Sequence, residues 1–136
     1  MKSAKPIILL EDDIVDVMTV RRALREIHVS NELIVFSNGE EALAHFANPD
    51  IETPCLVLLD LNMPRVSGIE FLKGLRSEPR FNKIPIVVLT SSDERQDVDQ
   101  SYFLGISGYM VKPMDYQKFV EMIRTIDLYW TLCEMP

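Results

Sequence analysis

Five short apolar runs alternate with five helical segments in this chain, and this alternation constrains the fold more than any other feature. The apolar runs have the length of β-strands and cover residues 6–10, 33–36, 55–59, 84–89 and 108–111. The segments between and after them repeat apolar residues every three to four positions, as one face of an α-helix does, and include residues 14–27, 42–46, 69–75, 93–104 and 115–132. This order predicts an α/β fold: a doubly wound, five-stranded parallel sheet with right-handed crossovers and helices on both faces.

Length and composition limit the class of protein. The 136 residues suit one domain, and no linker, repeat or low-complexity tract divides them, so we expect a single domain over residues 1–136. No apolar run approaches the ~20 residues of a membrane helix, and no signal-peptide segment precedes the first strand. Cys55 and Cys133 are too few for a disulfide framework, and the net charge of −7 disfavours nucleic-acid binding. We therefore expect a cytoplasmic protein that binds neither membrane nor nucleic acid directly.

The run Leu56–Leu59 leads straight into Asp60, and Pro64 ends any regular strand four residues later. A continuous apolar run is typical of a strand buried on both faces, hence central in a parallel sheet. Asp60 then lies at the carboxyl end of that strand, which is the edge where open α/β sheets bind ligands. Because Asp also caps loops near turns, this stretch alone leaves Asp60 as a loop cap or an active carboxylate.

Residues after three other strands favour the active carboxylate. Glu11 and Asp12 follow the first strand, Thr90 ends the fourth and Lys112 follows the fifth. A parallel sheet brings these ends to one edge, where three carboxylates would repel one another unless a divalent cation bound them. Mg²⁺ suits such a site because it takes a few carboxylate oxygens and keeps several waters. Asp60 is then placed to act as a nucleophile toward phosphorus, with Mg²⁺, Lys112 and the Thr90 hydroxyl at the phosphoryl oxygens.

Four motifs, in order at the right strand ends, carry a family resemblance: residues 9–13 (LLEDD), 58–64 (LLDLNMP) with Gly68 beyond, 89–92 (LTSS) and 108–113 (GYMVKP). From end to end the chain resembles the CheY-like receiver domain of two-component response regulators. The resemblance implies the flavodoxin-like strand order 2-1-3-4-5. It also implies a single-domain signalling protein, not an enzyme, that accepts a phosphoryl group from a sensor histidine kinase or a His-phosphotransfer protein in a Mg²⁺-dependent reaction.

The resemblance assigns roles at the acidic edge. Asp60 matches the phosphoacceptor, and Glu11 and Asp12 match the acid pair, with Asp12 the direct Mg²⁺ ligand. Asn62 would give its backbone carbonyl to the metal. The first acid of the pair is Glu where Asp is usual, a variant that leaves coordination by Asp12 intact. Asp13 continues the acidic run and is expected to cap the following helix.

The resemblance also assigns a phosphoryl-binding pair and a switch. Thr90 and Lys112 would hold the phosphoryl oxygens, and the Lys112–Pro113 peptide is expected to be cis. Tyr109 matches the aromatic switch whose rotamer follows Thr90. Taken singly, Lys112 is better explained as a solvated lysine, and Thr90 could be a turn hydroxyl and Tyr109 a half-buried aromatic. The common place of Thr90 and Lys112 at the strand ends favours their functional roles.

Three other classes remain alternatives. A Mg²⁺-dependent phosphohydrolase also forms an aspartyl phosphate, but generally has a second Asp two residues after the nucleophile, where this chain has Asn62. A flavodoxin-like cofactor protein needs a phosphate-cradling loop after the first strand, where this chain has acids. A pseudo-receiver would lack Asp60 or Lys112, and both are present.

Two helices carry apolar residues whose placement the spacing predicts. In the first, a stripe is expected to face the core and comprises Ile14, Val17, Met18, Val20, Ala23, Leu24 and Ile27. The last helix has more apolar residues than one buried stripe needs. Its core face is expected to comprise Phe119, Met122 or Ile123, Ile126, Trp130 and Cys133, and others lie off it. Because exposed apolar patches usually mark interfaces, we expect a partner face comprising Val98, Phe103, Tyr109, Tyr116 and Val120. It would bind a kinase or a second copy of the chain; the alternative is one wide buried stripe. The ending, residues 128–136, resembles stand-alone receivers of bacterial phytochromes.

Overall fold

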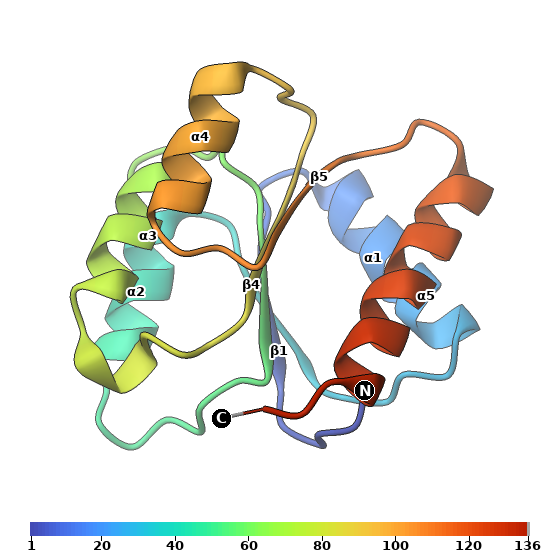
Figure 1. Cartoon of the computed structure of the whole chain (residues 1–136), viewed down its shortest axis with the longest axis horizontal. Helices are drawn as coiled ribbons and strands as arrows, with labels where there is room; N and C mark the ends of the chain where they lie inside the picture. Colours follow the sequence, from blue (N-terminus) through green and yellow to red (C-terminus); the bar gives the residue numbers. More distant parts are fainter. Residues whose placement is uncertain (136) are drawn as a thin grey trace.

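The computed structural model describes residues 1–135 and contains a five-stranded parallel sheet between two layers of helices (Figure 1). The strands are β1 (Ile7–Leu10), β2 (Leu33–Phe36), β3 (Leu56–Leu59), β4 (Ile86–Thr90) and β5 (Gly108–Val111), in the order β2-β1-β3-β4-β5. The helices are α1 (Ile14–Glu26), α2 (Gly39–Ala47), α3 (Gly68–Arg76), α4 (Arg95–Phe103) and α5 (Tyr116–Leu132), with a 3₁₀ turn, η1 (Pro79–Phe81). α1 and α5 cover one face of the sheet, and α2, α3 and α4 cover the other (Figure 1). The predicted α/β class and strand order are confirmed.

The three central strands are buried along their whole length, whereas β2 and β5 at the edges are largely half-buried. Continuous apolar sequences suit the central strands because helices cover both faces there. A core lies on each side of the sheet. One core contains Phe71 and Phe81 and lies on the side of α2 and α3. The other contains Val20 of α1 and Trp130 of α5.

Local signals fix where the helices begin. The Asp13 side chain accepts hydrogen bonds from the backbone N–H groups of Val15 and Asp16, so its predicted role as the α1 cap is confirmed. Ser67 and Glu70 form a capping box at the start of α3. The 3₁₀ turn η1 was not predicted; it begins at Pro79, shortly after the end of α3 at Arg76. Over residues 1–135, none of the helices combines the length and apolar character needed to cross a membrane.

The buried stripe of α1 is narrower than predicted. Val20, Ala23 and Leu24 are buried, but Ile14 and Met18 are 73% and 63% exposed. At 3.6 residues per turn, Ile14 and Met18 lie about 120° and 160° around the helix from Val20. The predicted stripe joined apolar residues at steps of three to four positions. Some of these residues lie outside the face of α1 that meets the sheet.

Two residues predicted for the partner face belong elsewhere. Val120 is 3% exposed and packs in the core shared with α1. The Tyr116 hydroxyl donates to Glu26 Oε2 at 2.9 Å, and the Arg22 guanidinium lies 4.2 Å from the centre of its ring. Both side chains lie on the side of α5 that meets α1. On that side, α5 buries a wide stripe of its residues. The prediction was wrong for Tyr116 and Val120.

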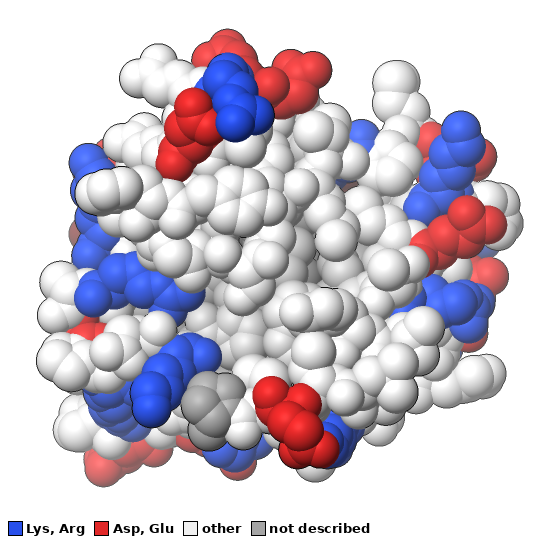
Figure 2. Space-filling model, in the orientation of Figure 1, with Lys and Arg blue, Asp and Glu red and all other residues white. Residues whose placement is uncertain are grey.

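The other three residues predicted for the partner face belong to α4 and to the edge strand β5: Val98, Phe103 and Tyr109. We use "α4–β5–α5 face" for Val98, Phe103, Tyr109, Val111 and Tyr129. Phe103 is 89% exposed, Tyr129 58% and Val111 46%, and Val98 and Tyr109 are half-buried. The centre of this side of the molecule carries few charged groups, and the Lys, Arg, Asp and Glu side chains gather around its rim (Figure 2). The face therefore combines exposed apolar side chains with a weakly charged centre and a charged rim, an arrangement that suits an interface.

Candidate functional site

The strand register places the polar residues at one edge of the sheet. Leu10 of β1 is level with Leu59 of β3, so Glu11 and Asp60 both follow directly at the same height. Thr90 of β4 is level with Val111 of β5. The Lys112 N–H donates to the Thr90 carbonyl at 2.8 Å, which continues the sheet by one residue. The predicted convergence of these side chains follows from this register.

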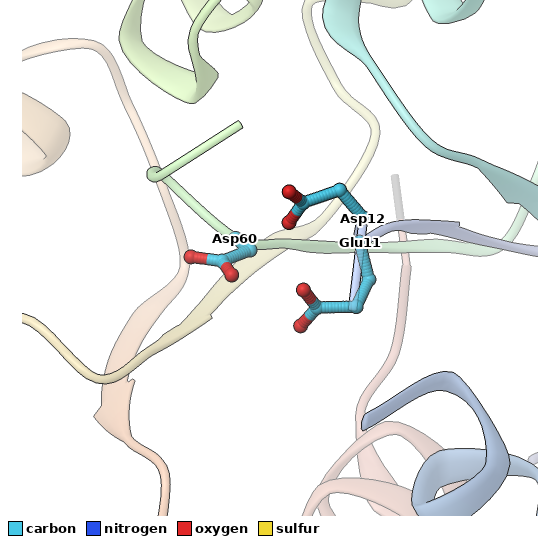
Figure 3. Close-up of side chains that lie close together, drawn as sticks. All are labelled: Glu11, Asp12 and Asp60. Atoms are coloured by element: carbon cyan, nitrogen blue, oxygen red, sulfur yellow. The ribbon is translucent and has the colours of Figure 1, made fainter. Parts of the chain in front are cut away.

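Three carboxylates face a common space (Figure 3). Glu11, Asp12 and Asp60 each offer an oxygen, and these oxygens lie within 4.8 Å of one another. Glu11 and Asp60 are buried, at 3% and 6% exposure, whereas Asp12 is exposed. This set fits Mg²⁺, because two fixed carboxylates and one solvated carboxylate leave room for the waters that Mg²⁺ retains.

The electrostatics of Glu11 also favour a cation. Burial raises the pKa of Glu11 to about 7; the hydrogen bond from Lys112 opposes this shift, and the charge of Asp60 adds to it. Burial and the charge of Asp60 therefore destabilise the ionised form of Glu11. A divalent cation in the shared space would offset both effects.

Both oxygens of Asp60 are held in place. Oδ1 accepts a hydrogen bond from Thr90 Oγ1 at 2.8 Å and one from the Asn62 backbone N–H at 3.1 Å. Oδ2 accepts from Lys112 Nζ at 3.2 Å. The carboxylate is thus oriented by groups from β4, from the loop after β3 and from the end of β5. Metal coordination by the Asn62 carbonyl remains a prediction.

Gly68 lets the loop after Asp60 close. A Cβ atom at this position would lie 2.6 Å from Leu61 Cα and 2.7 Å from the Asp60 carbonyl oxygen, both in the backbone. The Gly68 N–H donates to the Leu61 carbonyl at 3.0 Å. The loop that follows the carboxylate can therefore fold back tightly only because residue 68 lacks a side chain.

Lys112 contacts more carboxylates than the sequence predicted. Its Nζ lies 2.5 Å from Glu11 Oε1, 2.8 Å from Asp16 Oδ2 and 3.2 Å from Asp60 Oδ2. Burial by itself would lower the pKa of Lys112, but the hydrogen bonds to Asp16 and Glu11 and the charge of Asp60 together raise it. Asp16 was not among the predicted site residues. Its only sequence signal is an acid in the first turn of a helix, which the helix dipole explains equally well.

The Lys112–Pro113 peptide bond is trans, so the prediction of a cis bond was wrong. The trans form is favoured by roughly 0.5–1 kcal/mol even before proline. With the trans bond, the Lys112 side chain already contacts its three carboxylates, so the site needs no cis bond for this arrangement.

Tyr109 of β5 takes part in a small hydrogen-bond network with the loop between β4 and α4. Its hydroxyl donates to the Ser92 carbonyl at 2.8 Å, and the Ser92 hydroxyl donates to Asp97 Oδ2 at 2.7 Å. The Ser92 N–H in turn donates to Thr90 Oγ1 at 3.4 Å. Tyr109 and Thr90 are therefore linked through Ser92. Ser92 and Asp97 were not predicted, because a serine-rich loop gives no sign of which hydroxyl is used.

Comparisons with known proteins agree with this geometry. The family model of the response regulator receiver domain matches residues 7–124. Response regulator Rcp1 of Synechocystis sp. is 33% identical over 130 residues, which cover 93% of this chain and 88% of that protein. Among solved structures, the phosphorylated cyanobacterial phytochrome response regulator RcpA has a TM-score of 0.90 at 30% identity and covers 98% of this chain and 99% of its own. The Mn²⁺-bound form of Rcp1 has a TM-score of 0.87 at 32% identity, covering 97% and 99%. The bacteriophytochrome response regulator RtBRR is 40% identical, with a TM-score of 0.76 and coverage of 97% and 84%.

Proposed function

This chain belongs to the response regulator receiver family, and from that premise we propose that Asp60 is its phosphoacceptor. The protein is a phosphoacceptor of two-component signalling, and the phosphohydrolase alternative is not favoured. One observation carries the assignment to Asp60. Its buried carboxylate is hydrogen-bonded by both Thr90 and Lys112 and shares a space with Glu11 and Asp12.

The transfer step follows from the position of Asp60. An Asp60 oxygen attacks the phosphorus of a phosphohistidine, the O–P bond forms as the P–N bond breaks, and the leaving imidazole keeps the electron pair and takes up a proton. Thr90 and Lys112 then bind oxygens of the transferred group. Placement and positive charge supply most of the catalysis in such transfers, since the protein has little covalent chemistry to perform.

We propose that Asp12, Asp60 and Glu11 hold Mg²⁺, with Asp12 a direct ligand and the Asn62 carbonyl completing the protein set. Support comes from the convergence of the three carboxylates and from the Mn²⁺-bound form of the relative Rcp1. The bound ion would supply positive charge to the phosphoryl oxygens during transfer.

The partner we propose is a sensor histidine kinase, of the bacterial phytochrome type, or a His-phosphotransfer protein. The support is similarity to RcpA, a cyanobacterial phytochrome response regulator, and to the bacteriophytochrome response regulator RtBRR. The α4–β5–α5 face is the proposed output surface, which binds a partner or a second copy of the chain. Its exposed Phe103 and Tyr129 and its weakly charged centre support that role (Figure 2).

Tyr109 is the proposed link between the site and that face. A phosphoryl group brings roughly −1.5 to −2 charges and three acceptor oxygens, and Thr90 is one of its nearest donors. Any movement of Thr90 reaches Tyr109 through Ser92, which contacts both. The half-buried Tyr109 side chain would then change the surface around it.

The test is labelling by a small phosphodonor such as acetyl phosphate with Mg²⁺, followed by intact-mass measurement. The wild-type protein should gain one phosphoryl group, and Asp60→Asn should gain none. Asp50→Asn removes the same charge from an exposed loop and should label like the wild type. Undiminished labelling of Asp60→Asn would refute the assignment.

A further inference from the structure

We propose that Asp16 is a positioning residue that competes with the phosphoryl group for Lys112; this rests on the proposed function of Asp60. Asp16 lies in the first turn of α1, and its Oδ2 is 2.8 Å from Lys112 Nζ. The contact joins two segments 96 residues apart in the sequence. It reaches the site from a helix, whereas Glu11, Asp60 and Lys112 follow directly after strands.

Lys112 cannot donate two hydrogen bonds to the phosphoryl group while it keeps both Glu11 and Asp16 as partners. A lysine ammonium has three N–H donors, and three carboxylates surround this one: Glu11 at 2.5 Å, Asp16 at 2.8 Å and Asp60 at 3.2 Å. The donor that faces Asp60 can transfer to a phosphoryl oxygen when Asp60 is modified. A second hydrogen bond from Lys112 to the phosphoryl group requires that Glu11 or Asp16 be released.

Asp16 is the carboxylate that can be released at lower cost. The Glu11 side chain is 3% exposed, so its release would leave a buried acceptor without its partner. The Asp16 side chain is 36% exposed and can bind water instead. Asp16 therefore keeps Lys112 partly turned toward α1, and the phosphoryl group must draw Lys112 away from it.

The consequence is that Asp16 lowers the affinity of the site for a phosphoryl group. Removing its charge weakens the hydrogen bond that holds one donor of Lys112 and so strengthens the phosphorylated state. Because Asp16 is partly exposed, water screens the pair and the effect is moderate, about threefold to tenfold in affinity.

The experiment measures the affinity for beryllofluoride, a phosphoryl mimic, with saturating Mg²⁺, by calorimetric titration of the full chain. Asp16→Asn should bind about threefold to tenfold more tightly than the wild type. Asp50→Asn, the matched change of charge on an exposed loop, should bind as the wild type does. In a Lys112→Met background, Asp16→Asn should have no effect, because a double-mutant cycle isolates the part that acts through Lys112.

Each outcome decides the proposal. Equal affinity of Asp16→Asn and the wild type overturns the role of Asp16 and leaves Asp60 as the acceptor. A gain that survives in the Lys112→Met background also overturns it, since simple repulsion between Asp16 and the anion would then be the cause. A wild-type protein that binds no beryllofluoride overturns both the role of Asp16 and the proposed function.

Discussion

Thr90 Oγ1 lies 2.8 Å from Asp60 Oδ1, and both side chains are buried. This hydrogen bond joins the end of β4 to the end of β3 at the point where the proposed chemistry occurs. The same Thr90 oxygen accepts a hydrogen bond from the Ser92 N–H in the loop that holds Tyr109. Thr90 therefore contacts the acceptor directly and is linked to the proposed switch, Tyr109, through Ser92.

Loss of the Thr90 hydroxyl should affect both stability and phosphoryl binding. Thr90→Val keeps the volume and removes the donor to Asp60, and should lower the free energy of unfolding by about 1–2 kcal/mol. It should also weaken beryllofluoride binding, measured by titration. Thr90→Ser retains the hydroxyl and serves as the control; if Thr90→Val bound the mimic as well as Thr90→Ser does, the hydroxyl would have no role.

Removal of the exposed acid should weaken metal binding and phosphorylation together. Asp12→Ala takes one of three convergent carboxylates away and should weaken Mg²⁺ binding by at least about tenfold, since even the outer partners of metal ligands contribute about that much. Labelling by acetyl phosphate should fall in parallel. Full labelling of the wild-type protein in excess EDTA would contradict the requirement for a metal.

A side chain at residue 68 should disrupt the loop beside the acceptor. Gly68→Ala would place Cβ 2.6 Å from Leu61 Cα and 2.7 Å from the Asp60 carbonyl oxygen, so the backbone must shift. We expect a loss of about 2–3 kcal/mol in the free energy of unfolding, measured by urea denaturation.

Gly108→Ala is the control for this change. A Cβ atom at Gly108 would meet nothing within 4 Å, so its stability should stay within about 0.5 kcal/mol of the wild type. If the two alanine variants were equally stable, tight closure over Gly68 would not be needed.

A charge on the α4–β5–α5 face should change association and leave the fold intact. Phe103 is 89% exposed, so Phe103→Asp should alter stability by no more than about 0.5 kcal/mol. Sedimentation with and without beryllofluoride should show weaker association with a second copy or with a cognate kinase. The effect of the mimic on wild-type affinity should correspond to about 1–3 kcal/mol, the usual size of such coupling.

Met18→Asp is the control for self-association, because Met18 is also exposed and apolar but lies on α1. It should leave self-association unchanged. If neither Phe103→Asp nor the mimic altered any association, the face would be ordinary surface.

The sheet and the main site residues were predictable because both follow from local patterns. The buried strand β3 has no polar residue, so its limits are visible in the sequence, and Asp60 follows it directly. Parallel strands converge at their carboxyl ends, which brings Glu11, Thr90 and Lys112 to Asp60 without knowledge of the packing. Each of these inferences needs only the order of the strands.

What could not be predicted depends on packing between elements far apart in the sequence. Asp16 contacts Lys112 because the Lys112 side chain reaches from the end of β5 to the first turn of α1, a relation that no motif records. Val120 and Tyr116 lie on the α1 side of α5, and helical spacing alone does not determine which neighbour covers a given side.

The most direct test of the central claim is chemical trapping of the modified residue. Wild-type protein treated with acetyl phosphate and Mg²⁺ is reduced with borohydride, which converts an aspartyl phosphate to homoserine with release of phosphate. Peptide mass mapping should then find homoserine at residue 60, and should find none in Asp60→Asn or in samples that contain EDTA. Homoserine at another aspartate, with Asp60 unmodified, would contradict the account.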